Sequence, residues 1–205
     1  MSGRDNKPSR SSLYPIGLKL AGRRCVVVGS GPIARLKAEE LLACGAVVQE
    51  VARDFAPSDL DGVHLVVAAT DDRQVQEVVA RSADARGIPC NVVDVNHLCT
   101  FYAPAVLRRG ALTISVATDG KFPLFAVAIR DRIAAALGDS VGPALELLGE
   151  GRARACERFP DDPDGRVAAL RRLLSAPALE SILEGRLDEF EAHWESWKTE
   201  LSPRA

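Results

Sequence analysis

Apolar, β-branched runs alternate with stretches of mixed polarity along the first hundred residues of the chain. Such runs occur at residues 24–28, 63–69 and 91–93, and the first has no polar face. Strands that are buried on both faces of a parallel sheet have this character. The stretches at residues 34–44 and from Asp72 or Asp71 to about Ala85 are typical of helices. The alternation predicts an α/β fold with a parallel sheet.

A glycine-rich turn lies between the first predicted strand and the first predicted helix. Its two glycines would allow a tight turn and a close approach of the backbone to a pyrophosphate, and alanine is accepted at the third position of this fingerprint. The amino end of the following helix offers unpaired N–H groups to phosphates. Because a strand precedes the turn and a helix follows it, we predict a dinucleotide site of the Rossmann type. The residues predicted to bind the cofactor here are Gly29, Ser30, Gly31, Pro32, Ile33 and Ala34.

The second predicted strand, at residues 46–51, contains a single acid, Glu50. A Rossmann domain that binds NAD carries Asp or Glu at the end of this strand, where the carboxylate holds the ribose hydroxyls. Glu50 is therefore either a ribose ligand or an exposed strand residue. Arg53, just beyond the strand, would favour the 2′-phosphate of NADP. The predicted cofactor is NAD, with NADP not excluded.

Polar residues also follow the later strands. Ligands of open α/β sheets bind at the carboxyl ends of the strands, so Gly29, Thr70 and Asp94 are expected to converge on one edge. Thr70 is a further predicted cofactor-binding residue. Asp94 is the candidate catalytic carboxylate, and an ordinary turn residue is the alternative interpretation.

The pattern changes in the second half of the chain. Residues 112–117 alternate like a half-buried strand, and Pro123 suits the first position of a helix that runs to Leu137. Helical spacing continues through residues 141–159 and 166–197, with breaks at prolines. Trp194 and Trp197 share a helix face, so we expect them to anchor a core.

Composition narrows the class of protein. With 205 residues, 47% of them hydrophobic, the chain can bury one good core and a smaller second module. A net charge of −2 argues against a nucleic-acid-binding platform. No apolar run reaches the roughly 20 residues of a membrane span, and residues 1–12 resemble a disordered leader rather than a signal peptide. The five cysteines lack CxxC spacing, so we expect reduced thiols, no metal site and a cytoplasmic protein.

Taken in order, these motifs resemble the amino-terminal module of siroheme synthase, the precorrin-2 dehydrogenase/sirohydrochlorin ferrochelatase family. The segments that carry the resemblance are residues 14–18, 26–37, 65–72, 91–94, 101–106, 112–120 and 129–133. The resemblance implies an NAD(P)-binding Rossmann domain at residues 13–107, a dimerisation module at 108–138 and a helical domain at 139–205. The expected fold class is thus α/β, with a Rossmann-type parallel sheet followed by a small α+β dimerisation module and a helical carboxy-terminal region. A homodimer is also implied.

The chemistry implied by the family is removal of a hydride and a proton from precorrin-2, which gives sirohydrochlorin and reduced nicotinamide. Asp94 would act as general base or hold the macrocycle in register, and a carboxylate suits proton loss because it accepts within hydrogen-bond reach. In bifunctional members the same position also serves iron insertion. A non-catalytic nicotinamide-sensing module is the alternative from another functional class.

The implied tetrapyrrole substrate carries many carboxylates, so cations are expected around it. The predicted substrate-binding residues are Arg108, Arg109, Gly120, Lys121 and Arg130, with Arg35 and Lys37 as further candidate cations. Arginine would be the more selective partner because it pairs with carboxylates through two parallel bonds.

The chain departs from the family pattern at three places. Phe122 stands where a serine is common, and Asn96 stands where a proline is common. The connection at residues 52–62 is short, so residues 48–57 resemble the family's third strand as much as its second. His97 is either a metal-handling residue or a surface histidine. Iron insertion is therefore expected to be weaker than dehydrogenation.

Overall fold

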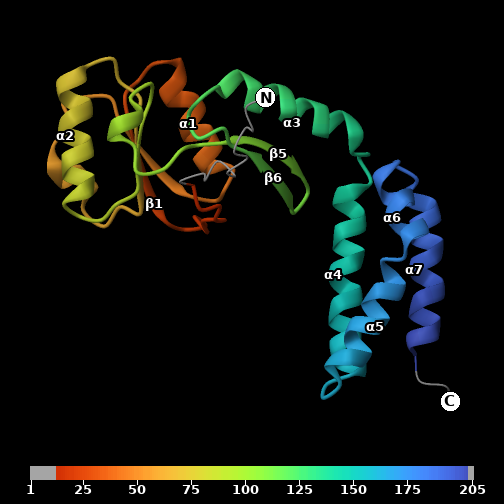
Figure 1. Ribbon diagram of the computed structural model, residues 1–205. Coiled ribbons are helices and arrows are strands. Elements are labelled where there is room, and N and C mark those ends of the chain that lie inside the picture. The colour runs from red at the N-terminus through yellow and green to blue at the C-terminus, as the bar shows by residue number, and fades with distance from the viewer. Residues whose placement is uncertain (1–12, 203–205) are drawn as a thin grey trace, which may run out of the picture. The chain divides into compact units, whose positions relative to one another are not determined.

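The computed structural model describes residues 13–202, which divide into two compact units (Figure 1). The first unit contains the described residues up to Ala103 together with Asp119–Lys121, and the second contains Pro104–Thr118 and the chain from Phe122 onward. The leader predicted at residues 1–12 lies outside the described part. Within that part, no helix has both the length and the apolar character needed to cross a membrane.

A parallel sheet of four strands forms the centre of the first unit, as the apolar runs predicted. Its strands, in the spatial order β2-β1-β3-β4, are β1 (Arg24–Val28), β2 (Val47–Val51), β3 (Leu65–Ala68) and β4 (Cys90–Val92). Val28 pairs with Val51 on one side and with Ala68 on the other, and Ala68 pairs with Val92. The last residues of all four strands therefore form one row along the carboxyl edge of the sheet.

Two helices cover opposite faces of this sheet. They are α1 (Pro32–Leu42) and α2 (Arg73–Asp84), and two short 3₁₀ helices, η1 (Pro57–Leu60) and η2 (Asn96–Leu98), lie in the connections. Successive strand residues point to opposite faces, so Val26 packs in one core with Val79 of α2, and Val27 packs in the other with Ala34 of α1. All four of these side chains are fully buried, so both faces of the sheet are covered at its centre.

The elements of the first unit differ from the predicted ones at their ends. Helix α1 begins at Pro32 rather than at Ala34, since the fixed φ of proline suits the first helical position. Strand β4 ends at Val92, one residue earlier than expected. Strand β2 pairs with β1 along its whole length, so it is the second strand of the βαβ unit, and the short connection after it contains η1.

The second unit begins with a hairpin of two antiparallel strands. Strand β5 (Ala105–Arg109) pairs with β6 (Leu112–Val116). The helices that follow in the described residues are α3 (Pro123–Ala136), α4 (Val141–Arg158), α5 (Pro163–Leu173), α6 (Ala176–Leu183) and α7 (Leu187–Leu201). In the part of the chain that the structure describes, β5 pairs with β6 alone, and both strands belong to the second unit. The predicted helical stretch at 166–197 is three helices, with Pro177 in the first turn of α6 and Gly185 at φ +85° before α7.

The tryptophan pair anchors the core of the last helices, as predicted. The Trp194 and Trp197 rings stack with their centroids 5.5 Å apart, and both side chains are buried. The indole N–H of Trp197 donates to the carbonyl of Ala169, 2.9 Å away, so its polar atom is satisfied. Leu173 and Leu201 complete the same cluster.

Gly151 of α4 provides a test of this core. A Cβ there would collide with Cδ2 of buried Leu173 and lie 2.9 Å from Cζ3 of Trp194. Gly151→Ala should therefore destabilise the unit by about 1–3 kcal/mol through overpacking. Gly149→Ala is the matched control: no heavy atom lies within 4 Å of its Cβ position, so helix propensity should stabilise it by about 0.5–1 kcal/mol. Thermal unfolding followed by tryptophan fluorescence distinguishes them, and equal shifts would contradict the packing.

Candidate functional site

The carboxyl edge of the sheet gathers the segments that follow β1, β3 and β4. The N–H of Ala69 donates to the carbonyl of Val28 at 2.7 Å, which continues the hydrogen-bond ladder beyond the last strand residues. The loops that carry Gly29, Thr70 and Asp94 therefore leave the sheet side by side. This is the edge at which open α/β sheets bind their ligands.

Gly29 makes the turn after β1, and its position admits no side chain. Its φ is +132°, and a Cβ would collide with the carbonyl oxygen of Ala69 and lie 2.7 Å from the carbonyl carbon. Its N–H donates to the carbonyl of Val51 at the end of β2 (3.0 Å). The backbone of Gly29 is thus clamped between the ends of β2 and β3.

Gly31 has a different reason to be glycine. It is the N-cap of α1 with φ −76°, which any residue adopts, and no heavy atom lies within 4 Å of its Cβ position. No side chain caps the helix. The space above Gly31 is therefore open toward the amino end of α1, where the helix dipole and unpaired N–H groups favour an anion. These features fit the pyrophosphate of a dinucleotide.

The remaining residues of the turn divide between surface and core. Ser30 and Ile33 are exposed, and Pro32 is the first helical residue. Ala34 is fully buried in the core between α1 and the sheet. A small residue at this third position therefore permits close packing of helix against strand.

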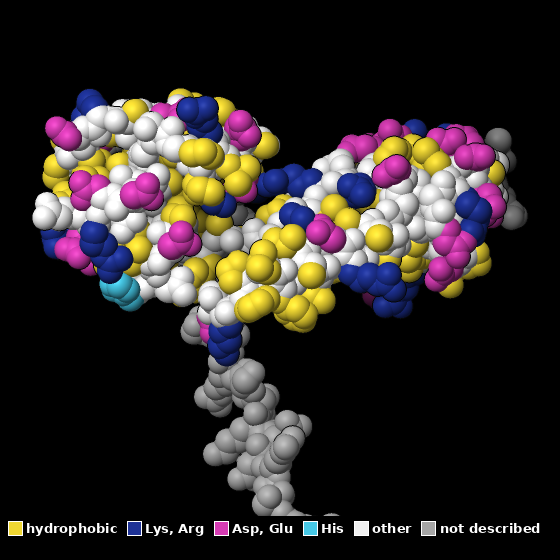
Figure 2. All heavy atoms as spheres, turned by 90° about the horizontal axis from the view of Figure 1, so that it is seen from above, with side chains coloured by type: hydrophobic (Ala, Val, Ile, Leu, Met, Phe, Trp, Pro, Cys, Tyr) yellow, Lys and Arg dark blue, Asp and Glu magenta, His cyan; other side chains and the backbone are white. Residues whose placement is uncertain are grey.

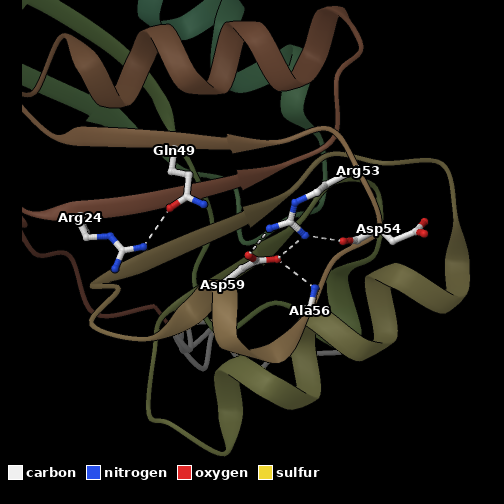
Figure 3. A network of polar contacts seen from close by, with 6 residues as sticks. All are labelled: Arg24, Gln49, Arg53, Asp54, Ala56 and Asp59. Carbon is white, nitrogen blue, oxygen red and sulfur yellow. Dashed lines mark hydrogen bonds and ion pairs between the residues drawn. The ribbon is translucent and has the colours of Figure 1, made fainter.

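Glu50 and Arg53 flank the end of β2 but differ in their surroundings. Val48 packs in the core on the α1 side, so by alternation Glu50 faces the same side, where it is exposed. Arg53 is bound elsewhere: its Nη2 lies 2.7 Å from Oδ1 of Asp59 (Figure 3). The chain thus presents an acid on the α1 side and a cation already paired.

Thr70 lies in a loop that α2 fixes. Its carbonyl accepts a 2.6 Å hydrogen bond from Nε2 of Gln76, a buried side chain, and its hydroxyl accepts from the N–H of Asp72 at 3.3 Å. Of the two predicted caps for α2, Asp72 is the cap, since its carboxylate accepts from the N–H groups of Gln74 and Val75. The sequence does not reveal the role of Gln76, because a glutamine inside a helix carries no local signal of it.

Asp94 lies exposed in the turn after β4. Its φ is +60°, a left-handed conformation in which aspartate is one of the better tolerated residues. The N–H of Val95 donates to the carbonyl of Val92 across the turn (3.2 Å). The Sγ of Cys99 accepts from the N–H of Val92 and donates to its carbonyl, both at 3.2 Å.

Two further side chains hold this loop and were missed in the sequence. Burial raises the pKa of the Cys99 thiol, so it stays protonated and keeps its donor. Nδ2 of buried Asn91 donates to the carbonyl of Phe101 at 3.1 Å. The loop that presents Asp94 is therefore pinned to β4 at two points.

Gly120 and Lys121 belong to the first unit although they are distant in sequence. Gly120 has φ +70°, and a Cβ there would lie 3.1 Å from Nδ2 of Asn96 and 3.4 Å from Cζ of Tyr102. It therefore packs against the segment that follows Asp94. Lys121 is exposed next to it.

The three predicted substrate-binding arginines belong to the second unit. Arg109 approaches Asp139 (Nε to Oδ1, 3.6 Å), and Nε of Arg130 donates to Asp131 at 2.8 Å. Arg108 is exposed on β5.

His97 lies beside a cation rather than beside other metal ligands. Its Nε2 is 3.3 Å from Nη2 of Arg73, which joins η2 to the first turn of α2. Within residues 13–202, no group of three or more His, Cys, Asp or Glu side chains is arranged to hold a metal ion.

Comparison with known proteins finds a matching family and several similar sequences. A family described as "Putative NAD(P)-binding" matches residues 16–105. Siroheme synthase of Chromobacterium violaceum is 36% identical over 192 residues, which cover 84% of this chain and 41% of that protein. Siroheme synthase of Methylococcus capsulatus is 34% identical over 197 residues, covering 86% and 41%. The chain thus spans about two fifths of the length of these curated relatives.

A solved structure has the same fold. The protein titled "SirC, precorrin-2 dehydrogenase" superposes with a TM-score of 0.67 at 21% sequence identity, over 90% of this chain and 100% of that chain. The predicted fold class, a Rossmann-type sheet followed by a helical carboxy-terminal region, is therefore confirmed, and the match includes the second unit.

The two glycines of the turn lead to opposite predictions. Gly31→Asp should leave the melting temperature unchanged, because the space is open and aspartate is a favourable N-cap, yet it should abolish dinucleotide binding by placing a negative charge at the pyrophosphate. Gly29→Ala should lower the melting temperature, because its Cβ meets the Ala69 carbonyl. Calorimetric titration with NAD⁺ and NADP⁺ measures the binding.

Gly31→Ala adds a side chain without a charge and is therefore the control. The affinity of this variant for the dinucleotide should fall less than the affinity of Gly31→Asp. Unchanged affinity in a folded Gly31→Asp variant would show that the dinucleotide does not bind at this turn.

Proposed function

Because the chain is homologous to part of the siroheme synthases, we propose that it oxidises precorrin-2 to sirohydrochlorin in siroheme biosynthesis, with a nicotinamide dinucleotide as oxidant. The observation that carries the proposal is the common position of the Gly29–Gly31 turn and Asp94 at one sheet edge. A phosphate-binding turn and a carboxylate at the same edge are what a reaction that removes a hydride and a proton together requires.

The cofactor would be held by the loops of this edge. The open amino end of α1 above Gly31 would bind the pyrophosphate, and Glu50 would accept hydrogen bonds from the ribose hydroxyls. The Thr70 hydroxyl, whose oxygen already accepts from Asp72, retains a proton to donate. When bound, the nicotinamide would supply the hydride acceptor. We favour NAD over NADP because Glu50 would repel a 2′-phosphate.

Asp94 would accept the proton that the substrate loses. Its carboxylate is exposed on the rim, and the loop that carries it is pinned by Cys99 and Asn91. A base acts only when it lies within hydrogen-bond reach of the proton, so a fixed loop favours this role. Lys121, beside the segment that follows Asp94, would pair with a carboxylate of the substrate, and Arg108, Arg109 and Arg130 of the second unit are further candidates.

We propose the cytoplasm as the site of the reaction. The described cysteines form no disulfide, as is usual in a reducing compartment.

Burial raises the pKa of the Cys90 thiol to about 12, so this side chain serves the core and not catalysis.

The proposed activity is tested by incubating the purified chain with precorrin-2 and NAD⁺ or NADP⁺ and following the tetrapyrrole spectrum. We expect conversion to sirohydrochlorin, faster with NAD⁺. Dinucleotide binding without conversion would indicate a sensing module instead. Addition of Fe²⁺ tests metal insertion, which we expect to be slow because Phe122 offers no polar side chain to relay a proton.

Asp94→Ala should reduce dehydrogenation by about 10²–10⁴-fold, the loss typical of a positioned acid or base, while the affinity for the dinucleotide stays unchanged. Asp71→Ala is the matched control, since it removes an exposed carboxylate from the neighbouring loop. Single-turnover rates of both variants decide the role. A nearly normal rate for Asp94→Ala would reduce Asp94 to a turn residue.

We also propose that the second unit forms a homodimer. A two-stranded sheet leaves an open edge on each strand, and pairing across a two-fold axis would cover it. Hydrophobic side chains gather on part of the face drawn in Figure 2. The exposed apolar side chains of α3 and its N-cap form what we call the apolar patch, which consists of Phe122, Leu124, Phe125 and Ile129.

Sedimentation velocity at micromolar concentration should give a dimer, and Leu124→Asp should convert it to a monomer by placing a charge in the apolar patch. Val167→Asp changes another exposed apolar residue of the same unit, on α5, and should leave the dimer intact. A monomeric wild-type chain would refute the proposed assembly.

A further inference from the structure

An ion pair closes the connection that follows β2 (Figure 3). The guanidinium of Arg53 meets the carboxylate of Asp59 through two bonds, Nη2 to Oδ1 at 2.7 Å and Nη1 to Oδ2 at 3.4 Å. Its Nη1 also donates to the backbone carbonyl of Asp54 at 2.8 Å. The Arg53 side chain is 63% exposed, whereas that of Asp59 is 8% exposed. An exposed cation is thus held by a buried carboxylate.

Asp59 is fixed independently of Arg53. Its Oδ2 accepts the N–H of Ala56 at 2.9 Å, and the residue lies on η1, which packs against the α2 side of the sheet. The N–H of Ala56 and then the Arg53 guanidinium lower the pKa of the Asp59 carboxyl, so the carboxylate is ionised at neutral pH. If Arg53 left, a buried charge would lose its counter-ion, which is costly.

Arg53 lies where a dinucleotide enzyme selects its cofactor. It is two residues beyond Val51, whose carbonyl accepts the N–H of Gly29 in the phosphate-binding turn (3.0 Å). A cation just beyond this strand accommodates the 2′-phosphate of NADP, and an acid at its end binds the free ribose hydroxyls of NAD. Glu50 faces the α1 side, while Arg53 is turned to η1 on the other side (Figure 3).

We propose that Asp59 determines the preference for NAD over NADP by holding the guanidinium of Arg53 away from the ribose position. Asp59 would act through Arg53, with which it is hydrogen-bonded, so its role is that of a positioning residue. With Arg53 held, a 2′-phosphate would meet Glu50 without a compensating cation. The inference rests on the proposed function, since it requires dinucleotide binding at this edge.

An ordinary structural ion pair would predict something different. Removal of one member of a purely structural ion pair with a buried carboxylate would lower the melting temperature and leave the ligand preference unchanged. A holding role predicts that loss of Asp59 changes affinity for one cofactor and not the other, and that the change requires Arg53.

The test compares the affinities of NAD⁺ and NADP⁺ by calorimetry in the wild type and in Asp59→Asn. Asparagine keeps an oxygen for the Ala56 N–H but removes the charge that holds Arg53. The ratio of the NADP⁺ to the NAD⁺ dissociation constant should fall by roughly tenfold, as expected for a new hydrogen-bonded charge pair with the 2′-phosphate. Asp54→Asn is the matched control, because it removes a neighbouring charge without touching the ion pair.

The double variant Arg53→Leu/Asp59→Asn should restore the wild-type ratio. An unchanged ratio in Asp59→Asn, or a fall that persists in the double variant, would overturn the inference. If Asp59→Asn fails to fold, the Arg53→Leu variant decides whether Arg53 is held away from the cofactor. Its affinity for NADP⁺ should equal that of the wild type. A lower affinity for NADP⁺ would mean that Arg53 already binds the 2′-phosphate and would overturn the inference. A wild type that binds neither dinucleotide would instead refute the proposed function.

Discussion

The geometry of the sheet edge depends on the close approach of Gly29 to the Ala69 carbonyl. No side chain fits between these two backbones, so the chain leaves β1 at φ +132° and turns at once into α1. This turn directs the amino end of the helix along the edge and leaves the space above Gly31 open. A helix dipole attracts an anion only near its end, and the clamp at Gly29 decides where that end lies.

The other loops of the edge are fixed by buried side chains rather than by glycine. Gln76 holds the carbonyl of Thr70, while Cys99 and Asn91 hold the loop of Asp94. Each bond satisfies a backbone group near the sheet that would otherwise be costly to bury. The loops can therefore present ligand-binding groups in fixed positions, which catalysis requires.

Local patterns in the sequence were sufficient for the parallel sheet and the glycine turn. Strands β1 and β3 are buried on both faces, so their composition reveals them, and Gly29 follows β1 directly. Strand β5 was missed because its five residues end in two arginines and its partner is the next strand, β6.

Tertiary contacts could not be predicted from one sequence. Arg53 and Asp59 are six residues apart, and this spacing by itself does not indicate an ion pair. The role of Cys99 depends on the contact of its Sγ with the backbone N–H of Val92, which only the folded chain brings about. The predicted sites of Arg109 and Arg130 were derived from charge alone, and in the structure these side chains lie beside Asp139 and Asp131. Charge indicates a class of ligand but not whether the cation is already paired.

Binding of the dinucleotide at the carboxyl edge of this sheet can be observed residue by residue, through the backbone amide chemical shifts of the isotopically labelled chain on titration with NAD⁺. We expect saturable shifts at Gly31, Ile33 and Ala34, with smaller shifts at Glu50 and Thr70, and none at Trp194 or Trp197. Shifts absent from residues 29–34, or centred on the helices α4–α7, would contradict it.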